Sequence, residues 1–418
     1  MAQAGLNSVT TGERMPLPQK AANDNRRRFL LLFANFGGNL GDLFILEQTL
    51  RWLRSRFPGC DCHVSPLADR RSVSLESSVV ERYAGVAMVS PFGPSLPDVW
   101  RRAGERWPVA LRALSPAVRF ATAREARDSG LWDLGDKADA VLSIGGGHWG
   151  GAYKSLTMLS ALEGIAAFAD KTLMLPHSMP RSVPRPVAKR LPTVLNRLSQ
   201  CFFRDPQSLA TALHYGVRTA TLVPDSAYLD LPASPPRRSP SATPTVAICL
   251  RNNTAGLKEL GWQPFARAIA ELRRAGTRLV CFTTHDRDDR EVWERFVAEP
   301  GVEGVAIDSL DQLFQLFRNA DVVVGDRLHA LILATLMGTP VLPVLSLPKV
   351  AGFARHAGIP GAVSRFPDLS WAAHVEPALK DWETRQRDLL AYASASHQHL
   401  TRSLTEAGPL AKLVVEHR

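Results

Sequence analysis

The chain has 418 residues, of which 45% are hydrophobic and 22% are charged, a balance typical of a soluble globular protein. At roughly 150 residues per domain, this length predicts two or three domains and allows a large core. The formal net charge is +10 at pH 7. Because the basic residues are mostly arginine and are spread along the chain without interleaved aromatic residues, the charge does not indicate a nucleic-acid partner.

The cysteine content and the hydropathy pattern exclude several other classes. The five cysteines are scattered and form no CxxC pair, so we expect reduced thiols and neither a zinc site nor a disulfide framework. No stretch approaches the roughly 20 apolar residues of a membrane span. The apolar run at 29–34 is too short for a signal peptide and leads into Gly, Asn and Asp. We therefore expect a cytoplasmic protein. Its basic charge is typical of a solvated, arginine-rich surface, and the alternatives are an anionic substrate or peripheral contact with the inner face of the membrane.

The first part of the chain alternates short apolar runs with amphipathic stretches. Residues 1–28 are polar and lack periodicity, which predicts a disordered tail. Residues 43–57 carry apolar side chains at helical spacing. The runs that predict buried strands are 29–35, 138–147, 172–176, 201–204 and 219–225. We interpret residues 29–231 as one Rossmann-like α/β domain.

A proline-rich segment then interrupts the pattern. Residues 232–244 hold five prolines in thirteen residues and no apolar run, which predicts a linker. After it, strands are predicted at 245–251, 277–284, 304–308, 320–325 and 340–345, with helices near 262–275, 287–298 and 309–319. Strands that alternate with helices predict parallel sheets covered on both faces. We therefore expect a second Rossmann-like domain at 245–375, facing the first across a cleft, and a charged helical tail at 376–418 that packs back.

The stretch GDRLHALILATLMGTP (325–340) places an arginine and a histidine where a buried strand turns into a buried helix. We predict Asp326 as the N-cap of this helix. Arg327 and His329 then fall in its first turn, whose free N–H groups and positive dipole end favour an anion. The structural alternative is a capped core helix with two surface cations.

Two glycine-rich runs also follow predicted strands, where open α/β sheets bind ligands. NFGGNLGD (35–42) lacks the first glycine of the dinucleotide fingerprint, and GGGHWGG (145–151) lacks the Lys-Ser/Thr of a P-loop. The candidate ligand-binding residues of these two runs are Asn39, Asp42, Gly146, Gly147 and His148. Asp42 is also a candidate helix cap, and His148 could bond a sugar. A simple turn is the alternative for both runs.

Three further polar groups have weaker signals. His177 in LPHSMP (175–180) and Arg204 in FFRDPQS (202–208) end predicted strands. Lone residues of these types are usually structural, but strand-end geometry could bring Arg204 near Arg327. We interpret HDRDD (285–289) as a solvated loop, so no metal site is expected.

Together these motifs resemble the polysaccharide pyruvyl transferase family over most of residues 30–358. The motifs that carry the resemblance are NLGD, ADAVLSIGGG, RDPQS, VPD and above all DRLHALILATLMGTPVLPV followed by PKVAGF. The resemblance implies a GT-B-like fold and the transfer of a pyruvyl group from phosphoenolpyruvate to sugar hydroxyls, typically as a cyclic ketal. The N-terminal domain would then be the acceptor side and the C-terminal domain the donor side.

The resemblance also implies roles for individual residues. Arg327 and His329 are expected in the donor site as the catalytic residues, with Arg204 as a further phosphoenolpyruvate ligand. The family also uses a histidine of the N-terminal domain, which is either His177 or His148. Asp326 and the lysine of PKVAGF, Lys349, complete the set of candidate substrate-binding residues.

The chemistry of the residues agrees with this family. Phosphoenolpyruvate carries a carboxylate and a phosphate, and the planar fork of arginine binds such oxyanions through two hydrogen bonds. Histidine is the natural proton donor to the methylene carbon near neutral pH. Arg327 and the helix dipole predict a neutral His329 in the empty site, and bound phosphate should reverse that field. This chemistry requires no cofactor.

Two other functions share some of these features. A GT-B glycosyltransferase with a nucleotide-sugar donor would have the same two domains and a helix terminus that binds a diphosphate. A non-catalytic binder of anionic polysaccharide or lipid-linked sugar would bind a glycan without turnover. For the transferase, we expect an acceptor in an exopolysaccharide or cell-surface glycan precursor, and a lipid-linked oligosaccharide at the inner membrane face would suit the basic surface.

Overall fold

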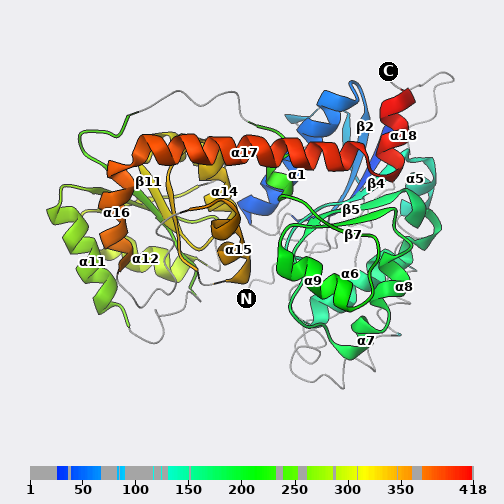
Figure 1. Ribbon diagram of the computed structural model, residues 1–418, viewed down its shortest axis with the longest axis horizontal. Helices are drawn as coiled ribbons and strands as arrows, with labels where there is room; N and C mark the ends of the chain where they lie inside the picture. Colours follow the sequence, from blue (N-terminus) through cyan, green and yellow to red (C-terminus); the bar gives the residue numbers. More distant parts are fainter. Residues whose placement is uncertain are drawn as a thin grey trace, which may run out of the picture.

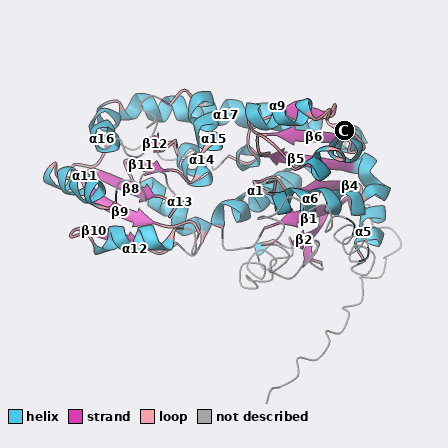
Figure 2. Ribbon diagram, turned by 90° about the horizontal axis from the view of Figure 1, so that it is seen from below, coloured by secondary structure: helices cyan, strands magenta, loops and turns pink. Residues whose placement is uncertain are grey.

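The computed structural model describes residues 26–35, 39–66, 82–83, 85–89, 116, 124, 130–149, 152–231, 239–252, 261–285, 289–307, 309–345, 347–359 and 370–416. Two parallel sheets lie side by side along the long axis of the molecule, each belonging to one α/β domain (Figure 1). A view at right angles shows the strands of each sheet enclosed between helices (Figure 2). The expected fold class, two Rossmann-like domains, is confirmed.

The N-terminal sheet has seven parallel strands in the order β3-β2-β1-β4-β5-β6-β7. The strands are β1 (Arg28–Ala34), β2 (Asp61–Pro66), β3 (Val86–Met88), β4 (Ala140–Ser143), β5 (Thr172–His177), β6 (Gln200–Phe203) and β7 (Ala220–Leu222). The order runs outward from β1 in both directions, as in doubly wound folds that bind ligands at the strand ends. The helices are α1 (Leu40–Arg56), α5 (Leu131–Lys137), α6 (Ala152–Gly164), η1 (Ala166–Lys171), α7 (Arg185–Ala188), α8 (Leu191–Leu195), α9 (Pro206–His214) and η2 (Ser226–Tyr228).

The C-terminal sheet has five parallel strands in the order β10-β9-β8-β11-β12. The strands are β8 (Thr245–Cys249), β9 (Arg278–Phe282), β10 (Val302–Val305), β11 (Val322–Gly325) and β12 (Val341–Pro343). The helices are α11 (Gln263–Arg274), α12 (Arg290–Ala298), α13 (Leu310–Asn319), α14 (Leu328–Leu336) and α15 (Pro348–His356). Strands β8 and β11 are buried along their whole length, because helices cover both faces of a parallel sheet.

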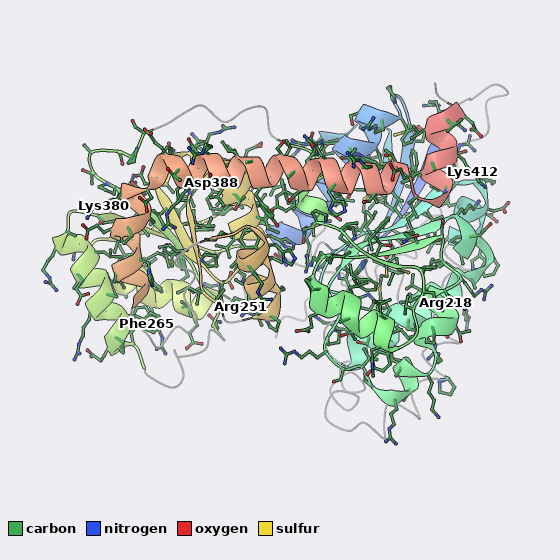
Figure 3. All side chains as sticks on the ribbon, viewed as in Figure 1. Arg218, Arg251, Phe265, Lys380, Asp388 and Lys412 are labelled. Atoms are coloured by element: carbon green, nitrogen blue, oxygen red, sulfur yellow. The ribbon has the colours of Figure 1, made fainter. Side chains whose placement is uncertain are left out.

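The C-terminal segment joins the two domains. Helices α16 (Ser370–Lys380), α17 (Trp382–Thr405) and α18 (Gly408–Glu416) follow each other, and α17 runs along the molecule over both domains (Figure 1). Lys380 at the end of α16 and Lys412 in α18 accordingly lie near opposite ends of the long axis (Figure 3). Helix α17 packs on α14 of one domain and on η2 of the other. None of the helices in the described part of the chain is long and apolar enough to cross a membrane.

One apolar cluster extends through both domains and fixes their contact. It includes residues of α1, η2, α13, α14 and α17. In it, Phe44 of α1 meets Phe314 of α13 edge to face, with ring centroids 5.6 Å apart. The backbone N–H of Leu40 also donates to the carbonyl of Thr284, 3.1 Å away in the other domain. The first turn of α1 is therefore held against the C-terminal domain.

Several predictions at the ends of elements can be compared with these bounds. Strand β1 begins at Arg28, so the last residue assigned to the N-terminal tail is part of the sheet; residues 1–25 lie outside the described residues. Of the predicted linker, 232–238 likewise lie outside them. The five cysteines are buried and free of disulfides, as expected.

Candidate active site

The candidate site is built where strand ends of the two sheets meet. Arg204 follows β6 in the N-terminal domain, and His329 lies in the first turn of α14, which follows β11 in the C-terminal domain. The guanidinium Nη1 of Arg204 lies 3.2 Å from the imidazole Nε2 of His329. Because arginine can only donate, Nε2 accepts this hydrogen bond and carries no proton. The two residues are 125 positions apart in the chain, so only the fold brings them together.

Asp225 holds Arg204 in this position. Its Oδ2 accepts from Nη1 of Arg204 at 2.6 Å and lies 3.8 Å from Nε2 of His329. Nε of Arg204 donates to Oγ of Ser178 at 2.7 Å. The side chain of Arg204 is 3% exposed, and its buried Nη2 has no hydrogen-bond partner among the residues that the structure describes. An unsatisfied buried N–H group of a charged side chain is costly, so Nη2 is available for an anionic ligand.

The surroundings keep the imidazole of His329 uncharged. Burial lowers the pKa of His329 to about 4; Asp225 and Asp42 oppose this shift, while Arg204 and Lys349 add to it. The expected neutral His329 is therefore confirmed. The principal cause is burial rather than Arg327, and the nearby arginine that disfavours the charge is Arg204.

The first turn of α1 forms the wall opposite α14. A Cβ atom on Gly41 would lie 2.2 Å from Nδ1 of His329, so only glycine lets the helix approach the ring. Asn39 is the N-cap of α1, and its side chain accepts from the N–H of Gly41. The predicted cap, Asp42, instead accepts at Oδ2 from the amides of Asn35 (2.5 Å) and Asn39 (3.0 Å). That prediction is wrong because the helix begins at Leu40, three residues earlier than a cap at Asp42 requires.

Two histidines of the N-terminal domain lie behind Arg204. The rings of His148 and His177 meet edge to face with centroids 5.7 Å apart, and each has a buried Nε2 without a partner in the described part of the chain. Nδ1 of His177 contacts the carbonyl of Leu175 at 2.5 Å, so it carries the proton and leaves Nε2 as an acceptor. Burial lowers the pKa of His177 to about 3. Burial also lowers the pKa of His148; Arg204 adds to this shift and Asp42 opposes it.

The glycine-rich turn after β4 explains how these rings pack. Gly146 has φ +145°, and a Cβ there would lie 2.8 Å from Nε2 of His148. A Cβ on Gly147 would lie 4.0 Å from Nη2 of Arg204. The bare backbone of this turn therefore lies beside the unsatisfied guanidinium nitrogen, as expected of a strand-end turn that a ligand approaches.

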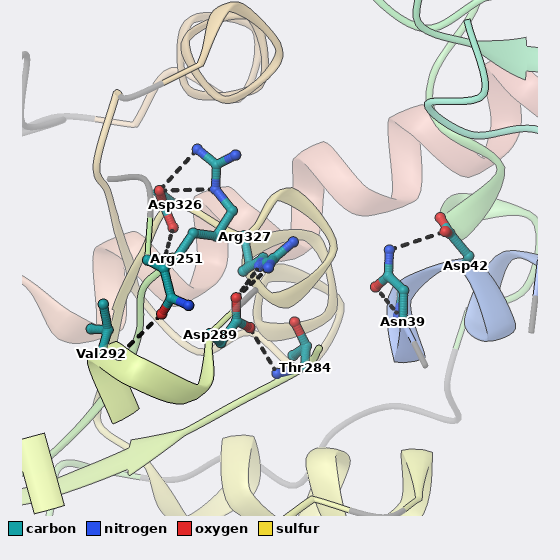
Figure 4. Close-up of polar contacts among 10 residues, drawn as sticks. Asn39, Asp42, Arg251, Thr284, Asp289, Val292, Asp326 and Arg327 are labelled. Atoms are coloured by element: carbon teal, nitrogen blue, oxygen red, sulfur yellow. Dashed lines mark hydrogen bonds and ion pairs between the residues drawn. The ribbon is translucent and has the colours of Figure 1, made fainter. Parts of the chain in front are cut away.

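Two more arginine–aspartate pairs lie at strand ends of the C-terminal domain (Figure 4). Arg251 donates from Nε and Nη2 to Oδ2 of Asp326, at 3.1 Å each. Arg327 donates to Oδ1 of the fully buried Asp289, from Nε at 2.8 Å and also from Nη2. The predicted N-cap role of Asp326 is wrong, because Arg327 caps α14 and the Asp326 carboxylate is bonded to Arg251.

Lys349, in the first turn of α15, faces these arginines. Burial lowers its pKa to about 8; Arg204, Arg251 and Arg327 add to the shift, and Asp42 opposes it. Among the described residues it has no ion-pair or hydrogen-bond partner. Lys349, Arg204 and Asp225 line a cavity of about 40 Å³ together with apolar side chains of α14 and α15.

The outcomes for the predicted residues differ. The structure brings Arg204, His329, Asp42, Lys349, His148 and His177 together. Arg204, which was expected near Arg327, contacts His329, and both arginines lie close enough to Lys349 to lower its pKa. The interpretation of HDRDD as a solvated loop fails at Asp289, which is buried against Arg327; 286–288 lie outside the described residues. Sequence reasoning missed Asp225 and Arg251 as site residues, although Asp225 stands in the motif VPD, and it gave no role to Ser178, which follows His177 in LPHSMP. The described residues contain no group of side chains that could hold a metal ion.

Known structures define the class of fold. A UDP-GlcNAc 2-epimerase from Neisseria meningitidis bound to UDP-GlcNAc aligns with a TM-score of 0.56 and 9% identity over 92% of this chain and 100% of that chain. A putative UDP-N-acetylglucosamine 2-epimerase from Listeria monocytogenes aligns with a TM-score of 0.55 and 12% identity over 91% of this chain and 95% of that chain. Arabidopsis thaliana UGT89C1 complexed with quercetin aligns with a TM-score of 0.52 and 12% identity over 93% of this chain and 98% of that chain. The protein therefore has the two-domain GT-B architecture.

The sequence comparison identifies the family. No curated protein sequence matches the chain significantly. The family model for polysaccharide pyruvyl transferase matches residues 39–346, which include both sheets except β1 and run from the first turn of α1 past β12. The chain belongs to the polysaccharide pyruvyl transferase family and is a pyruvyltransferase enzyme.

Proposed function

We propose that the protein transfers the pyruvyl group of phosphoenolpyruvate to two hydroxyls of one sugar, as a ketal, in an exopolysaccharide or cell-surface glycan precursor. The observation that carries this proposal is the contact between His329 and Arg204. An uncharged buried imidazole lies against a guanidinium whose Nη2 is unsatisfied. This arrangement suits a small ligand that needs both an anion-binding group and a proton.

The donor carries anionic groups that the unsatisfied hydrogen-bond donors of this site can bind. The phosphate and carboxylate of phosphoenolpyruvate would bind Nη2 of Arg204, Lys349 and the N–H groups of the first turn of α14. Arg327, close enough to lower the pKa of Lys349, would support the same anion while it stays bonded to Asp289. We keep Arg327 and Asp326 in the proposed donor site, with Asp326 acting through Arg251.

Donor binding would also prepare the acid. While Nη1 of Arg204 donates to Nε2 of His329, that nitrogen cannot carry a proton. When the guanidinium turns its N–H groups toward the phosphate, Nε2 is released, and the added negative charge favours its protonation. His329 then gives the proton to the methylene carbon, and the electrons of the C=C bond form the new C–H bond.

The remaining steps follow from the cation that this protonation produces. The central carbon becomes oxocarbenium-like, and one sugar hydroxyl attacks it. Phosphate then leaves as the second hydroxyl closes the ketal ring. The two buried acceptors at Nε2 of His148 and His177, with Asn39 and the turn at Gly146 and Gly147, are proposed to orient substrates on the N-terminal side.

The reaction as proposed uses no cofactor, and a lipid-linked acceptor at the inner membrane face would suit the basic surface. The test is incubation with labelled phosphoenolpyruvate and glycolipid intermediates extracted from cells, followed by mass measurement. Phosphate release together with the added mass of a pyruvate ketal supports the proposal. UDP release from a nucleotide-sugar donor, without incorporation of pyruvate, would favour the glycosyltransferase alternative.

A further inference from the structure

Asp42 differs from the other carboxylates around the site in how its two oxygens are used. Both oxygens of Asp225 are bonded, Oδ2 to Arg204 and Oδ1 to the N–H of Ala227. Both oxygens of Asp289 are bonded as well, Oδ1 to Arg327 and Oδ2 to the N–H of Thr284. At each of these carboxylates, both oxygens already accept a hydrogen bond from the protein.

The same holds for the two other carboxylates nearby. Asp326 accepts from the N–H of Arg251 at Oδ1 and from its guanidinium at Oδ2. Asp205 accepts from the N–H of Ser208 at Oδ1 and from the hydroxyls of Ser178 and Ser208 at Oδ2. Each of these carboxylates therefore accepts hydrogen bonds from the protein at both oxygens.

At Asp42, two amides converge on one oxygen. Asn35 and Asn39 both donate to Oδ2, and Oδ1 accepts no hydrogen bond from the described residues. The carboxylate is thus fixed in orientation by one oxygen, while the other remains able to accept a proton. Figure 4 shows Asn39 and Asp42 next to each other at the start of α1.

Asp42 also lies close to the groups that act on the donor. The adjacent Gly41 packs against the ring of His329. Burial acts to raise the pKa of Asp42, but His329, His148, the amide of Asn35 and Lys349 outweigh burial and lower it. The carboxylate is therefore ionised at neutral pH, on the domain opposite the imidazole.

The proposed reaction needs such a group. His329 supplies a proton to the methylene carbon, so it cannot at the same moment remove one from the attacking hydroxyl. Bond formation to an oxocarbenium-like carbon makes that hydroxyl strongly acidic, so a carboxylate of low pKa is a sufficient base.

We propose that Oδ1 of Asp42 takes the proton of the attacking sugar hydroxyl during pyruvyl transfer; this inference rests on the proposed function. The hydroxyl oxygen forms a bond to the central carbon of the donor as its O–H bond breaks, and the proton moves to Oδ1. The C=C electrons form the C–H bond with the proton of His329. The second hydroxyl forms the other C–O bond, its proton leaves with the phosphate, and Asp42 returns its proton to His329 through solvent.

The test compares Asp42→Asn with wild type and with Asp139→Asn. Asp139 accepts from the N–H of Arg28 at the opposite end of β1, so its substitution controls for the loss of a partly buried carboxylate hydrogen bond away from the site. Phosphoenolpyruvate affinity is measured by calorimetry. Turnover is measured as phosphate release with a panel of p-nitrophenyl hexosides that carry free 4- and 6-hydroxyls and with the cell-derived glycolipid fraction.

The expected result is a loss of turnover by about 10²–10⁴ in Asp42→Asn, with donor affinity within about threefold and Asp139→Asn like wild type. Asp42→Ala with added formate provides the second measurement, because formate can replace the missing base. Formate should restore turnover at least about tenfold.

Two outcomes overturn the assignment. One is an Asp42→Asn variant that keeps turnover within about threefold of wild type, and the other is a folded Asp42→Ala variant that formate does not rescue. If wild type itself neither binds phosphoenolpyruvate nor releases phosphate with any acceptor, the proposed function fails instead.

Discussion

Binding of phosphoenolpyruvate should raise the pKa of His329 and draw a proton from solution. In the empty site burial holds this pKa at about 4, so about 0.3% of the imidazole is charged at pH 6.5. A bound phosphate carries about two negative charges. At about 5 Å and an effective dielectric constant of about 20, each charge favours the imidazolium by about 3 kcal/mol.

This interaction is large enough to change the protonation state. About 6 kcal/mol corresponds to about 4 pKa units, and the additional burial caused by the ligand removes part of that gain. A net rise of about 3 units places the pKa of His329 near 7, where about three quarters of the imidazole is charged at pH 6.5. Donor binding should therefore take up about three quarters of a proton at His329.

The proton uptake can be measured by titration calorimetry in buffers of different ionisation enthalpy. The phosphate of the donor also exchanges protons when it binds, so the quantity of interest is the difference between wild type and His329→Gln. The glutamine side chain can still accept from Arg204, which keeps donor binding comparable. Equal proton uptake by the two proteins, with equal affinity, would refute the reasoning.

Three other changes test the site. Lys349 must be charged to bind an anion, and burial lowers its pKa to about 8. The kcat/KM for phosphoenolpyruvate, measured as a function of pH, should therefore fall above pH 8. In Lys349→Arg this fall should move to higher pH. A methyl group at position 41 would lie 2.2 Å from Nδ1 of His329, so Gly41→Ala should lose turnover by more than about tenfold in a steady-state assay and yet stay folded. Burial lowers the pKa of His177 to about 3, below its value near 6.5 in the unfolded state. Between these two pH values the unfolded state binds more protons than the folded state. The free energy of unfolding should therefore fall as pH drops from 6.5 toward 3. His177→Gln should flatten that decline in thermal melts, and an unchanged slope would exclude His177 as its cause.

The architecture could be predicted from the sequence because local apolar runs and helix-capping signals largely determine where strands and helices form. Apolar runs of four to seven residues became parallel strands, and β8 to β12 all lie in or next to their predicted ranges. Helix α14 follows β11 directly, as its capping signals indicated, although it begins after Arg327 rather than after Asp326. Strands β2 and β3 were not predicted; β2 mixes Cys, His and Ser with few apolar residues, and β3 has only three residues.

The polar partners in the site depend on distance in space, which a single sequence does not encode. Asp289 is 38 positions from Arg327, and Arg251 is 75 positions from Asp326. Asp289 belongs to a run of charged residues that is typical of a solvated loop, and only the packing of α12 beside β9 makes it a buried partner. Arg204 could be placed at a strand end, but its contact with His329 required both domains.

The pairing of these charges explains why the protonation of His329 should depend on donor binding. Arg204, Arg251 and Arg327 are each bonded to a buried carboxylate, and Lys349 lies in the field of Asp42. Within the described residues, the carboxylates at the site therefore at least match its cations in number. A donor that brings about three further negative charges finds hydrogen-bond donors but no surplus of positive charge. In a buried site such an excess is costly, and the base that can reduce it by taking up a proton beside the ligand is His329. Burial keeps this imidazole neutral in the empty enzyme, and the charge balance of the site makes its protonation depend on the donor that will receive the proton.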